Sequence, residues 1–436
     1  ENRRFKLENK LIAPRKIQGF WELMPKEEAL FEDMLSRLRK VFENNCFQPL
    51  DTPVAEFSEI LLAKSGGDVD KEIYRFTKGH ADICLRYDLT VPLARFVAGN
   101  MNELIFPFKR YQIGKVYRGE RPQKGRFREF YQCDADVIGE NLSLTYDAEC
   151  IKLYEPCFKE LHLDAMVEIS NRKLLAGFFE SLGGNVVELM TIVDKVDKLP
   201  KEEIASLFKE KGLTASDIEK TMKIISTKGD IKEVKALSSM CDNDTFKKGM
   251  EELEIVDEYL KALGMTNYLY NLSIVRGHDY YTGTVFECYI KGKRSFGAIG
   301  GGGRYDNLCK NFMETKMEGV GMSIGITRLF DILRNENLLN TENYTSIEIG
   351  IITFNETLLA GLALMNKFRE SGVKADIINE NKSFKAKMKE ANKRSLPYII
   401  ILGEDEVKAS IYTLKNMQTG EQEKLKFDEI IEKLKH

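Results

Sequence analysis

Residues 105–138 read IFPFKRYQIGKVYRGERPQKGRFREFYQCDADVI. Two extended runs in this stretch flank a short basic loop from Glu120 to Arg128, a pattern that predicts a long β-hairpin. On the return run, Gln132, Asp134 and Asp136 lie at alternate positions and so share one face of the strand. Acids are costly to bury without a polar ligand. The face therefore indicates a ligand site, and exposure of this face to solvent is the alternative.

The tip of the hairpin is crowded with positive charge. Arg118 and Glu120 share a face at its start, and four further cations follow: Arg121, Lys124, Arg126 and Arg128. Like charges this close repel one another. The loop is therefore expected to meet phosphates or acids.

A second informative stretch covers residues 275–287, VRGHDYYTGTVFE. It reads as a loop that runs into a β-strand. Arg276 can bind an oxyanion through its planar guanidinium, and Tyr281 can hydrogen-bond a small polar ligand. A purely structural turn is the alternative interpretation.

Residues 86–92, RYDLTVP, read as a strand that enters a helix. Period-2 alternation predicts Arg86, Asp88 and Thr90 on one face. A carboxylate beside a hydroxyl suits a bound ammonium group. Equally, Asp88 or Thr90 could simply cap the helix that follows.

Two glycine-containing stretches follow. Residues 296–306, FGAIGGGGRYD, lack the Lys-Ser/Thr of a phosphate-binding Walker loop, and four glycines allow either a close ligand approach or a sharp bend. Residues 319–330, GVGMSIGITRLF, predict a strand and then a helix with Arg328 in its first turn. A cation there opposes the helix dipole, so a bound polyphosphate would explain it, and a surface arginine is the alternative.

Composition limits the class of protein. The chain has 436 residues, 43% hydrophobic and 31% charged, with a net charge of −3. No apolar run reaches the about 18 residues of a membrane span, and the first residues lack the apolar core of a signal peptide. The eight cysteines form no CxxC pair, and no second pair completes a metal site with His80 and Cys84. Reduced thiols in the cytoplasm are therefore expected, without a zinc site.

The pattern of elements predicts three domains. Residues 1–171 and 263–334 read as one mixed α/β domain that includes an amphipathic helix from Glu27 to Asn44. Residues 172–262 have helical periodicity and many charges, and they predict a helical insertion. Residues 345–436 alternate strands and helices and predict a small α/β domain. Its second helix, Phe384 to Arg394, is basic through Lys382, Lys385, Lys387, Lys389, Lys393 and Arg394; an ordinary solvated helix is the alternative.

Five of these stretches together resemble a known family. The helix and the strand ending at Pro53 resemble motif 1 of class II aminoacyl-tRNA synthetases, residues 108–130 resemble motif 2, and residues 321–328 resemble motif 3. Residues 88–92 and 275–287 are similar to those of histidyl-tRNA synthetases. The resemblance implies an α/β (α+β) fold: an antiparallel-sheet class II catalytic core, a helical insertion and a C-terminal α/β anticodon-binding domain.

The resemblance also implies an activity, ATP-dependent ligation of L-histidine to tRNA-His through histidyl-adenylate. ATP would bring Mg²⁺, whose protein ligands the sequence does not identify. A cytoplasmic homodimer formed through the motif 1 region is implied, with no membrane partner. His278 stands where leucine or phenylalanine is usual, and it is interpreted as a packing substitution.

The resemblance assigns a role to each candidate site residue. Arg276 and Arg118 would be catalytic at the α-phosphate. Phe130 would stack on adenine beside Glu120, and Arg126 and Arg328 would hold the distal phosphates. The α-amino group of histidine would be held by Asp88, Thr90 and Gln132, and the imidazole pocket would be formed by Asp136, Tyr281 and Tyr305.

One alternative belongs to another class of protein: a catalytically silent paralogue that senses histidine and regulates a biosynthetic enzyme. Such relatives lose motif arginines and lack the C-terminal domain. This chain keeps Arg118, Arg276 and Arg328 together with residues 345–436. The sequence therefore favours the enzyme.

Overall fold

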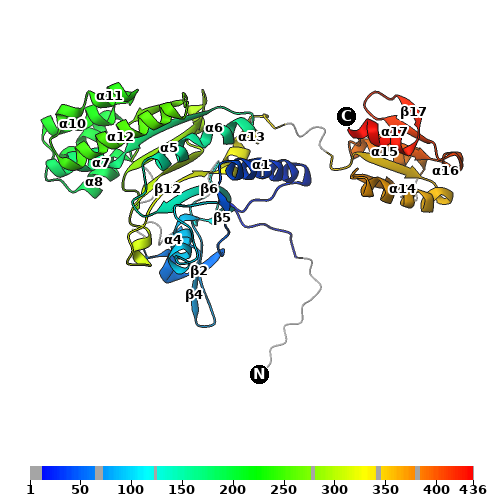
Figure 1. Cartoon of the computed structure of the whole chain (residues 1–436), viewed down its shortest axis with the longest axis horizontal. Coiled ribbons are helices and arrows are strands. Elements are labelled where there is room, and N and C mark those ends of the chain that lie inside the picture. Colours follow the sequence, from blue (N-terminus) through cyan, green and yellow to red (C-terminus); the bar gives the residue numbers. More distant parts are fainter. Residues whose placement is uncertain are drawn as a thin grey trace. The chain divides into compact units, whose positions relative to one another are not determined.

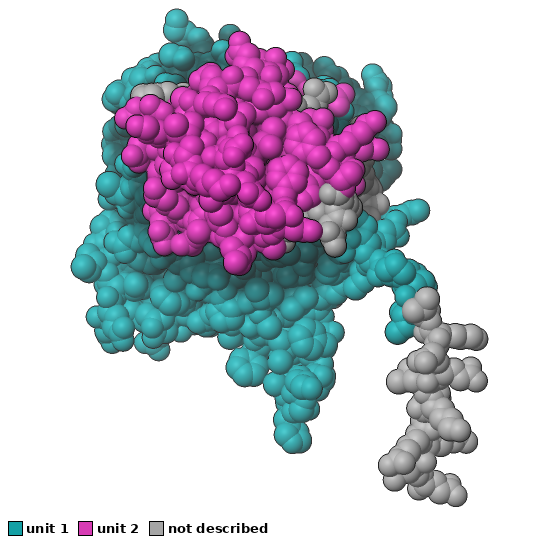
Figure 2. Space-filling view, turned by 90° about the vertical axis from the view of Figure 1, so that its right-hand side faces the viewer, with its two compact units in different colours: residues 1–22, 31–336 teal, residues 23–30, 337–436 magenta. Residues whose placement is uncertain are grey.

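The computed structural model describes residues 12–63, 72–121, 125–275, 280–339, 345–378 and 383–435. It divides into two compact units, one of residues 1–22 and 31–336, the other of residues 23–30 and 337–436 (Figures 1 and 2). Each unit has its own sheet. None of the helices in the described ranges is long and apolar enough to cross a membrane.

The first unit is built on a nine-stranded, mostly antiparallel sheet with the order β1-β5-β6-β12-β11-β10-β7-β9-β8. This confirms the antiparallel core predicted from the sequence. Only the β1–β5 and β7–β9 pairs are parallel among the described pairs of this sheet. The strands are β1 (Gln48–Pro49), β5 (Phe108–Tyr117), β6 (Glu129–Gly139), β7 (Ala165–Asn171), β8 (Lys228–Gly229), β9 (Tyr268–Asn271), β10 (Thr284–Ile290), β11 (Gly300–Tyr305) and β12 (Glu318–Ile324).

The hairpin β5–β6 lies inside this sheet and confirms the predicted pairing. Its register places Arg110 opposite Asp136 and Gln112 opposite Asp134. On β6, Cys133, Ala135 and Val137 are fully buried on one face, as expected. The acids of the other face, Asp134 and Asp136, are each only 3% exposed. Exposure of this face to solvent is therefore excluded.

Helices cover the sheet of the first unit (Figure 1). The part of α1 from Phe31 onward buries one apolar stripe, which ends with Leu38, Val41 and Phe42. Helix α1 begins at Pro25, two residues before the predicted start, because proline is favoured in the first turn. The main helices here are α1 (Pro25–Asn44), α4 (Thr90–Gly99), α5 (Thr145–Lys152), α6 (Tyr154–Glu160) and α13 (Ile326–Asn335), with the short helices α2 (Ser58–Leu61), η2 (Arg294–Phe296) and η3 (Cys309–Asn311).

A separate three-stranded sheet, ordered β2-β4-β3, adjoins α2 and α4 in this unit. Its strands are antiparallel: β2 (Ala55–Phe57), β3 (Arg75–Lys78) and β4 (Ala81–Leu85). Strand β3 is exposed along its whole length. This small sheet therefore leaves apolar side chains such as Phe57 and Phe76 in contact with solvent.

Residues 172–262 form a group of helices at the β8 end of the large sheet (Figure 1). Glycines allow two of them, α7 and α12, to pack backbone to backbone: a Cβ at Gly177 would lie 2.3 Å from the backbone nitrogen of Phe246. The expectation of no strong strand holds apart from the two-residue β8. The elements are α7 (Arg172–Ser181), α8 (Val186–Val193), α9 (Lys201–Glu210), α10 (Ala215–Ile225), α11 (Ile231–Lys235), η1 (Ser238–Met240) and α12 (Asp244–Ala262).

The second unit contains a five-stranded sheet ordered β14-β13-β15-β16-β17. The pairs of β13 with β14 and β15 are parallel, and the other two pairs are antiparallel. The predicted order of elements is confirmed except for the short helix α16, which the sequence analysis missed. The elements are β13 (Ile349–Thr353), η4 (Asn355–Thr357), α14 (Leu358–Glu370), β14 (Ala375–Ile378), α15 (Phe384–Lys393), β15 (Tyr398–Leu402), α16 (Glu404–Ala409), β16 (Tyr412–Asn416), β17 (Gln422–Leu425) and α17 (Phe427–Lys435).

A buried ion pair ties helix α5 to strand β11. The Arg304 guanidinium lies 2.6 Å from Asp147 Oδ2, and the two side chains are 5% and 0% exposed. Arg304 also donates to the carbonyl of Leu142 at 3.0 Å and to that of Ser143 at 3.2 Å. The pair therefore holds the segment that follows β6 against the strand that ends at Tyr305.

We predict that Asp147→Ala lowers the free energy of unfolding by about 3 to 5 kcal/mol, because it leaves the Arg304 cation buried without its partner. Urea unfolding followed by the fluorescence of Trp21, the only tryptophan, would measure this in the first unit. Lys198→Ala is the control, because its pair with Asp194 is exposed and should contribute less than about 1 kcal/mol. Equal effects of the two variants would contradict the role of the buried pair.

Candidate active site

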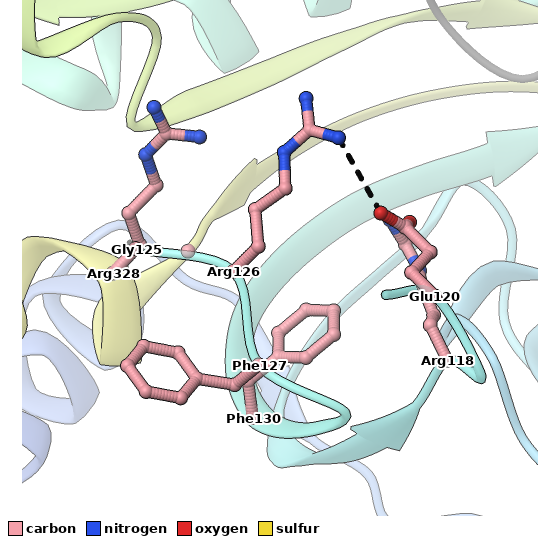
Figure 3. A pocket seen from close by; sticks show the side chains of 8 residues that line it. Arg118, Glu120, Gly125, Arg126, Phe127, Phe130 and Arg328 are labelled. Atoms are coloured by element: carbon pink, nitrogen blue, oxygen red, sulfur yellow. Dashed lines mark hydrogen bonds and ion pairs between the residues drawn. The ribbon is translucent and has the colours of Figure 1, made fainter. Parts of the chain in front are cut away.

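A pocket of about 280 Å³ lies where the β5–β6 hairpin meets the start of α13 (Figure 3). It is lined by eight residues, Arg118, Glu120, Gly125, Arg126, Phe127, Phe130, Gly325 and Arg328. All five residues expected from the sequence to bind ATP are among them. The fold therefore brings together positions more than 200 residues apart in the chain.

One wall of this pocket combines a cation with an aromatic ring. The Arg118 guanidinium lies over the Phe130 ring, 5.2 Å from its centroid. Its Nε donates to the carbonyl of Tyr87 at 3.1 Å. This bond fixes the direction of the side chain, so Arg118 presents a preoriented positive charge beside a flat apolar surface.

The other cations of the pocket come from the hairpin loop and from α13 (Figure 3). Arg126 lies 3.5 Å from Glu120, in a pair whose side chains are 57% and 29% exposed. Such a pair contributes little, so a phosphate could replace the carboxylate. Arg328 donates to the carbonyl of Phe296 at 3.0 Å.

Arg328 is half-buried in the first turn of α13, as predicted, and it is not an ordinary surface arginine. Burial lowers the pKa of Arg328, and the neighbouring charge of Arg126 lowers it further. Two cations that repel each other at a helix N-terminus form a site that a polyanion stabilises. The geometry thus favours a ligand with several phosphates.

A second group of side chains, centred on Asp136, is buried deeper in the sheet. Asp136 Oδ2 lies 2.7 Å from Arg110 Nη2, with both side chains at least 96% buried. Tyr305 donates its hydroxyl to Asp136 Oδ1 at 2.7 Å. The expected pairing of Asp136 with Tyr305 is therefore present, and Arg110 adds a cation that the sequence analysis did not assign.

Asp88 and Thr90 lie at the start of α4, buried at 1% and 8% exposure. Asp88 Oδ1 accepts from the backbone N–H of Val91 at 3.1 Å, so the capping alternative describes a real bond. Its other oxygen accepts from the Tyr280 hydroxyl at 3.4 Å. Asp88 thus caps the helix and also belongs to the buried polar group.

Burial dominates the electrostatics of these acids. It raises the pKa of Asp88, of Asp136 and of Asp134, the last to about 7. The Arg110 guanidinium lowers the pKa of Asp134 and of Asp136, whereas the acids raise one another's. Desolvated carboxylates that repel each other gain most from a cationic ligand. The group is therefore suited to an ammonium or a similar N–H donor.

Three acceptors of this face lack a hydrogen-bond partner within the described part of the chain: Gln132 Oε1, Asp134 Oδ1 and Asp136 Oδ2, of which only the last has an ion-pair partner, Arg110. The Gln132 amide donates through Nε2 to Ser323 Oγ at 3.0 Å, which leaves its oxygen free. Buried polar atoms are normally hydrogen-bonded. Unpaired acceptors here indicate that N–H donors of a ligand complete the site.

Tyr281 borders the same group. Its ring packs against that of Tyr280, with 5.0 Å between centroids. Burial raises the pKa of Tyr281, and the charges of Asp136 and Asp134 raise it further. Among the residues expected to bind histidine, Tyr281 and Tyr305 therefore both lie at the buried acids.

Two expectations from the sequence were wrong in detail. Arg86, Asp88 and Thr90 do not share a strand face, because β4 ends at Leu85; Arg86 instead donates to the carbonyls of Thr52 and Lys115. The glycine run is strand β11, where a Cβ at Gly302 would lie 2.1 Å from the carbonyl oxygen of Gly321. Those glycines therefore allow close strand packing. Arg276 and His278 lie outside the described residues.

Arg110, Tyr280 and Phe127 were not assigned to the site from the sequence. A signal for Arg110 existed, because the hairpin register places it directly opposite Asp136. For Tyr280 no strand periodicity was available, because residues 280–283 lie outside strand β10. Phe127 packs against Trp21, with 4.6 Å between ring centroids, and nothing local predicts that contact.

A mostly antiparallel sheet with arginines from a hairpin and from a following helix is the architecture of a class II aminoacyl-tRNA synthetase core. Comparison with known proteins agrees: the family model described as histidyl-tRNA synthetase matches residues 19–329. A model described as anticodon binding domain matches residues 348–436. The chain belongs to the histidyl-tRNA synthetase family.

Individual relatives match along their whole length. Histidine–tRNA ligase of Clostridium acetobutylicum is 45% identical, and the match covers 100% of that protein and 97% of this chain. Histidine–tRNA ligase of Clostridium tetani is 43% identical, and the match covers 99% of that protein and 98% of this chain. The crystal structure of histidyl-tRNA synthetase from Nostoc sp. PCC 7120 superposes with a TM-score of 0.88 at 33% identity and covers 98% of this chain and 99% of that one.

We predict that Arg328→Ala weakens binding of inorganic tripolyphosphate to the protein about 10- to 100-fold, the range of a lost charge-assisted hydrogen bond of about 1.5 to 3 kcal/mol. Isothermal titration calorimetry at fixed salt would measure this. Arg334→Ala is the matched control, because Arg334 lies on the same helix and pairs with Asp331. An unchanged affinity for Arg328→Ala would exclude Arg328 from phosphate binding.

Proposed function

We propose that this protein ligates L-histidine to tRNA-His in two steps, forming histidyl-adenylate and pyrophosphate from histidine and ATP, and then transferring the histidyl group to the terminal adenosine. The observation that carries this proposal is the position of Arg118 between the phosphate pocket and the buried acidic group. Arg118 lines the phosphate pocket, and its charge lowers the pKa of Asp88 in the buried acidic group. A nucleotide and an amino acid bound at the two sites would therefore meet at Arg118.

The first step is an in-line attack of the histidine carboxylate on the α-phosphorus, with pyrophosphate leaving. The carboxylate is already ionised at neutral pH, so no general base is needed. Catalysis then consists of positioning and of stabilising the charge that develops on the phosphate. We assign that charge stabilisation to Arg118 and Arg276, with Arg126 and Arg328 on the distal phosphates and Phe130 and Glu120 at adenine.

Recognition of histidine would divide the buried acids between its two ends. The α-ammonium group is assigned to Asp88, Thr90 and Gln132, whose oxygens include an unpaired buried acceptor. The imidazole is assigned to Asp136, Tyr281 and Tyr305. Burial raises the pKa of Asp136, and the charge of Arg110 opposes that shift and so favours the carboxylate that would accept an imidazole N–H.

ATP would bring Mg²⁺ to the phosphate pocket. Within the described ranges no cluster of three His, Cys, Asp or Glu side chains could hold a metal ion alone. Mg²⁺ commonly binds one or two carboxylates together with substrate phosphates and water. The charge of Glu287 acts on Arg328, which lines the pocket, so this carboxylate fits such a shared site. The ion would neutralise phosphate charge during the attack.

The silent paralogue is not favoured. A protein that only senses histidine has no use for a polyphosphate pocket. Here Arg118, Arg126 and Arg328 all line that pocket, and the second unit has a complete sheet. Retention of both features supports the enzyme.

We also propose a homodimer formed through the motif 1 region. The adjoining three-stranded sheet exposes Phe57 at 55% and Phe76 at 45% of their surface, and exposed apolar patches of this kind mark protein interfaces. A cytoplasmic location is supported by the eight cysteines, all of them free thiols, because thiols stay reduced there.

The C-terminal domain, residues 345–436, is proposed to bind the anticodon of tRNA-His, with residues 1–171 and 263–334 as the catalytic domain and 172–262 as an insertion. The basic face predicted on α15 is smaller than expected. Lys387 is 7% exposed and donates to the carbonyl of Thr353, and Arg394 pairs with Glu390 and Asp376. Lys385, Lys389 and Lys393 remain exposed for phosphate contacts.

Histidine-dependent exchange of pyrophosphate into ATP tests the function. We predict that the full chain catalyses it and that Asp136→Ala raises the histidine KM about 5- to 150-fold, equivalent to about 1 to 3 kcal/mol for an unpaired buried donor. The KM for ATP should stay within about twofold, because Asp136 lies outside the phosphate pocket. Absence of exchange by the wild-type chain would reject the enzyme, and an unchanged histidine KM would reject the imidazole assignment.

Truncation separates the two steps. We predict that a chain ending at Glu336 still exchanges pyrophosphate, since the proposed motif residues lie before that point, but charges tRNA poorly. Its remaining affinity for tRNA should depend less steeply on salt, because lysine–phosphate contacts are lost. Oligomeric state must be compared first, by sedimentation. A dimeric truncated enzyme that charges tRNA-His as well as the full chain would refute the anticodon role.

A further inference from the structure

The parallel strands of the second unit create a ligand-binding position at their carboxyl ends. Strand β13 lies between β14 and β15. The chain therefore continues from β13 to β14 at one edge of β13, and β15 is later added at its other edge. Ligands of such sheets bind at this switch point, outside the carboxyl ends of the strands. The turn that follows β13 is hydrogen-bonded to the end of β15, because the Thr357 hydroxyl donates to the carbonyl of Leu402 at 2.8 Å.

Two aromatic rings occupy this position. Phe354 directly follows β13, and Phe384 is the first residue of α15. Their rings are nearly parallel, with an interplanar angle of 22° and centroids 6.3 Å apart. Phe354 is 37% exposed and Phe384 is 43% exposed. A stacked pair of partly exposed rings presents a flat apolar surface that solvent does not stabilise.

Lysine side chains accompany this aromatic pair. The buried ammonium of Lys387 lies 5.9 Å from the centroid of the Phe354 ring and donates to the carbonyl of Thr353. It therefore fixes the end of β13 and adds a cation beneath the rings. Lys385 and Lys389, on the helix that Phe384 begins, are exposed. Flat rings beside exposed cations complement a nucleic acid base attached to its phosphates.

We propose that Phe354 and Phe384 form a stacking platform for one unpaired base of single-stranded RNA, with Lys385 and Lys389 at the flanking phosphates. This rests on the proposed function and specifies which surface of the anticodon-binding domain receives a base. Single-stranded RNA is recognised by stacking of splayed bases on aromatic side chains. A protein partner fits less well, because the helix that Phe384 begins exposes the cations Lys385 and Lys389.

The test uses the full chain and an RNA stem–loop with the seven-nucleotide loop of a tRNA-His anticodon arm. Phe354→Leu and Phe384→Leu keep apolar bulk but remove the ring, and each should weaken binding about tenfold, within the range of base–aromatic stacking. Phe384→Trp keeps a ring and should bind within about twofold of wild type. Leu359→Ala is the control for loss of exposed apolar surface, because Leu359 is 81% exposed.

Abasic substitution of single loop nucleotides identifies the stacked base. With one abasic loop, wild type and Phe384→Leu should bind equally, because the interaction is already absent. Wild-type affinity of both leucine variants, or an equal loss for Leu359→Ala, would overturn the platform. Histidine-dependent pyrophosphate exchange separates the two proposals. If only the stacking proposal is wrong, the wild type and all variants still catalyse exchange. If the proposed function is wrong, neither the wild type nor any variant catalyses it.

Discussion

The ion pair between Arg110 and Asp136 is the interaction on which the site depends. It joins the two strands of the central hairpin inside a sheet where both partners are cut off from water. Without Arg110, burial would drive Asp136 toward its neutral form. The cation therefore favours the charged form of this carboxylate in the interior of the first unit, where the other oxygen accepts a hydrogen bond from Tyr305.

A consequence is the separation of two chemistries along one hairpin. Acceptors, mostly acids, collect on the buried face of β6, and arginines collect at the open end of the hairpin and at the start of α13. Arg118 stands between them. Such a division suits a reaction between an amino acid held through its N–H groups and a polyanion, because the acidic face favours N–H donors and the arginines favour the anion.

Much of the arrangement of the site residues could be predicted from the sequence, and the physical basis of the prediction differs from one element to the next. The alternation of Gln132, Asp134 and Asp136 fixes which side chains share a face, because the period of a strand is two. The position of Arg328 followed from the glycine-rich strand and the helix after it. Prediction of Arg86 on the same face as Asp88 failed, because the strand ends at Leu85, before the first of these residues. On α15, helical spacing did not reveal that Lys387 faces the sheet.

By itself, the sequence determined the hairpin, most of the order of strands and helices in the second unit, and most of the polar residues with which a ligand could interact. These depend on local periodicity and on turn chemistry, which neighbouring residues specify. Only the tertiary structure decided that Arg110 pairs with Asp136, that Asp88 both caps α4 and meets Tyr280, and that Phe354 stacks on Phe384. Those contacts join residues distant in the chain, and their energies depend on burial, which no local pattern sets.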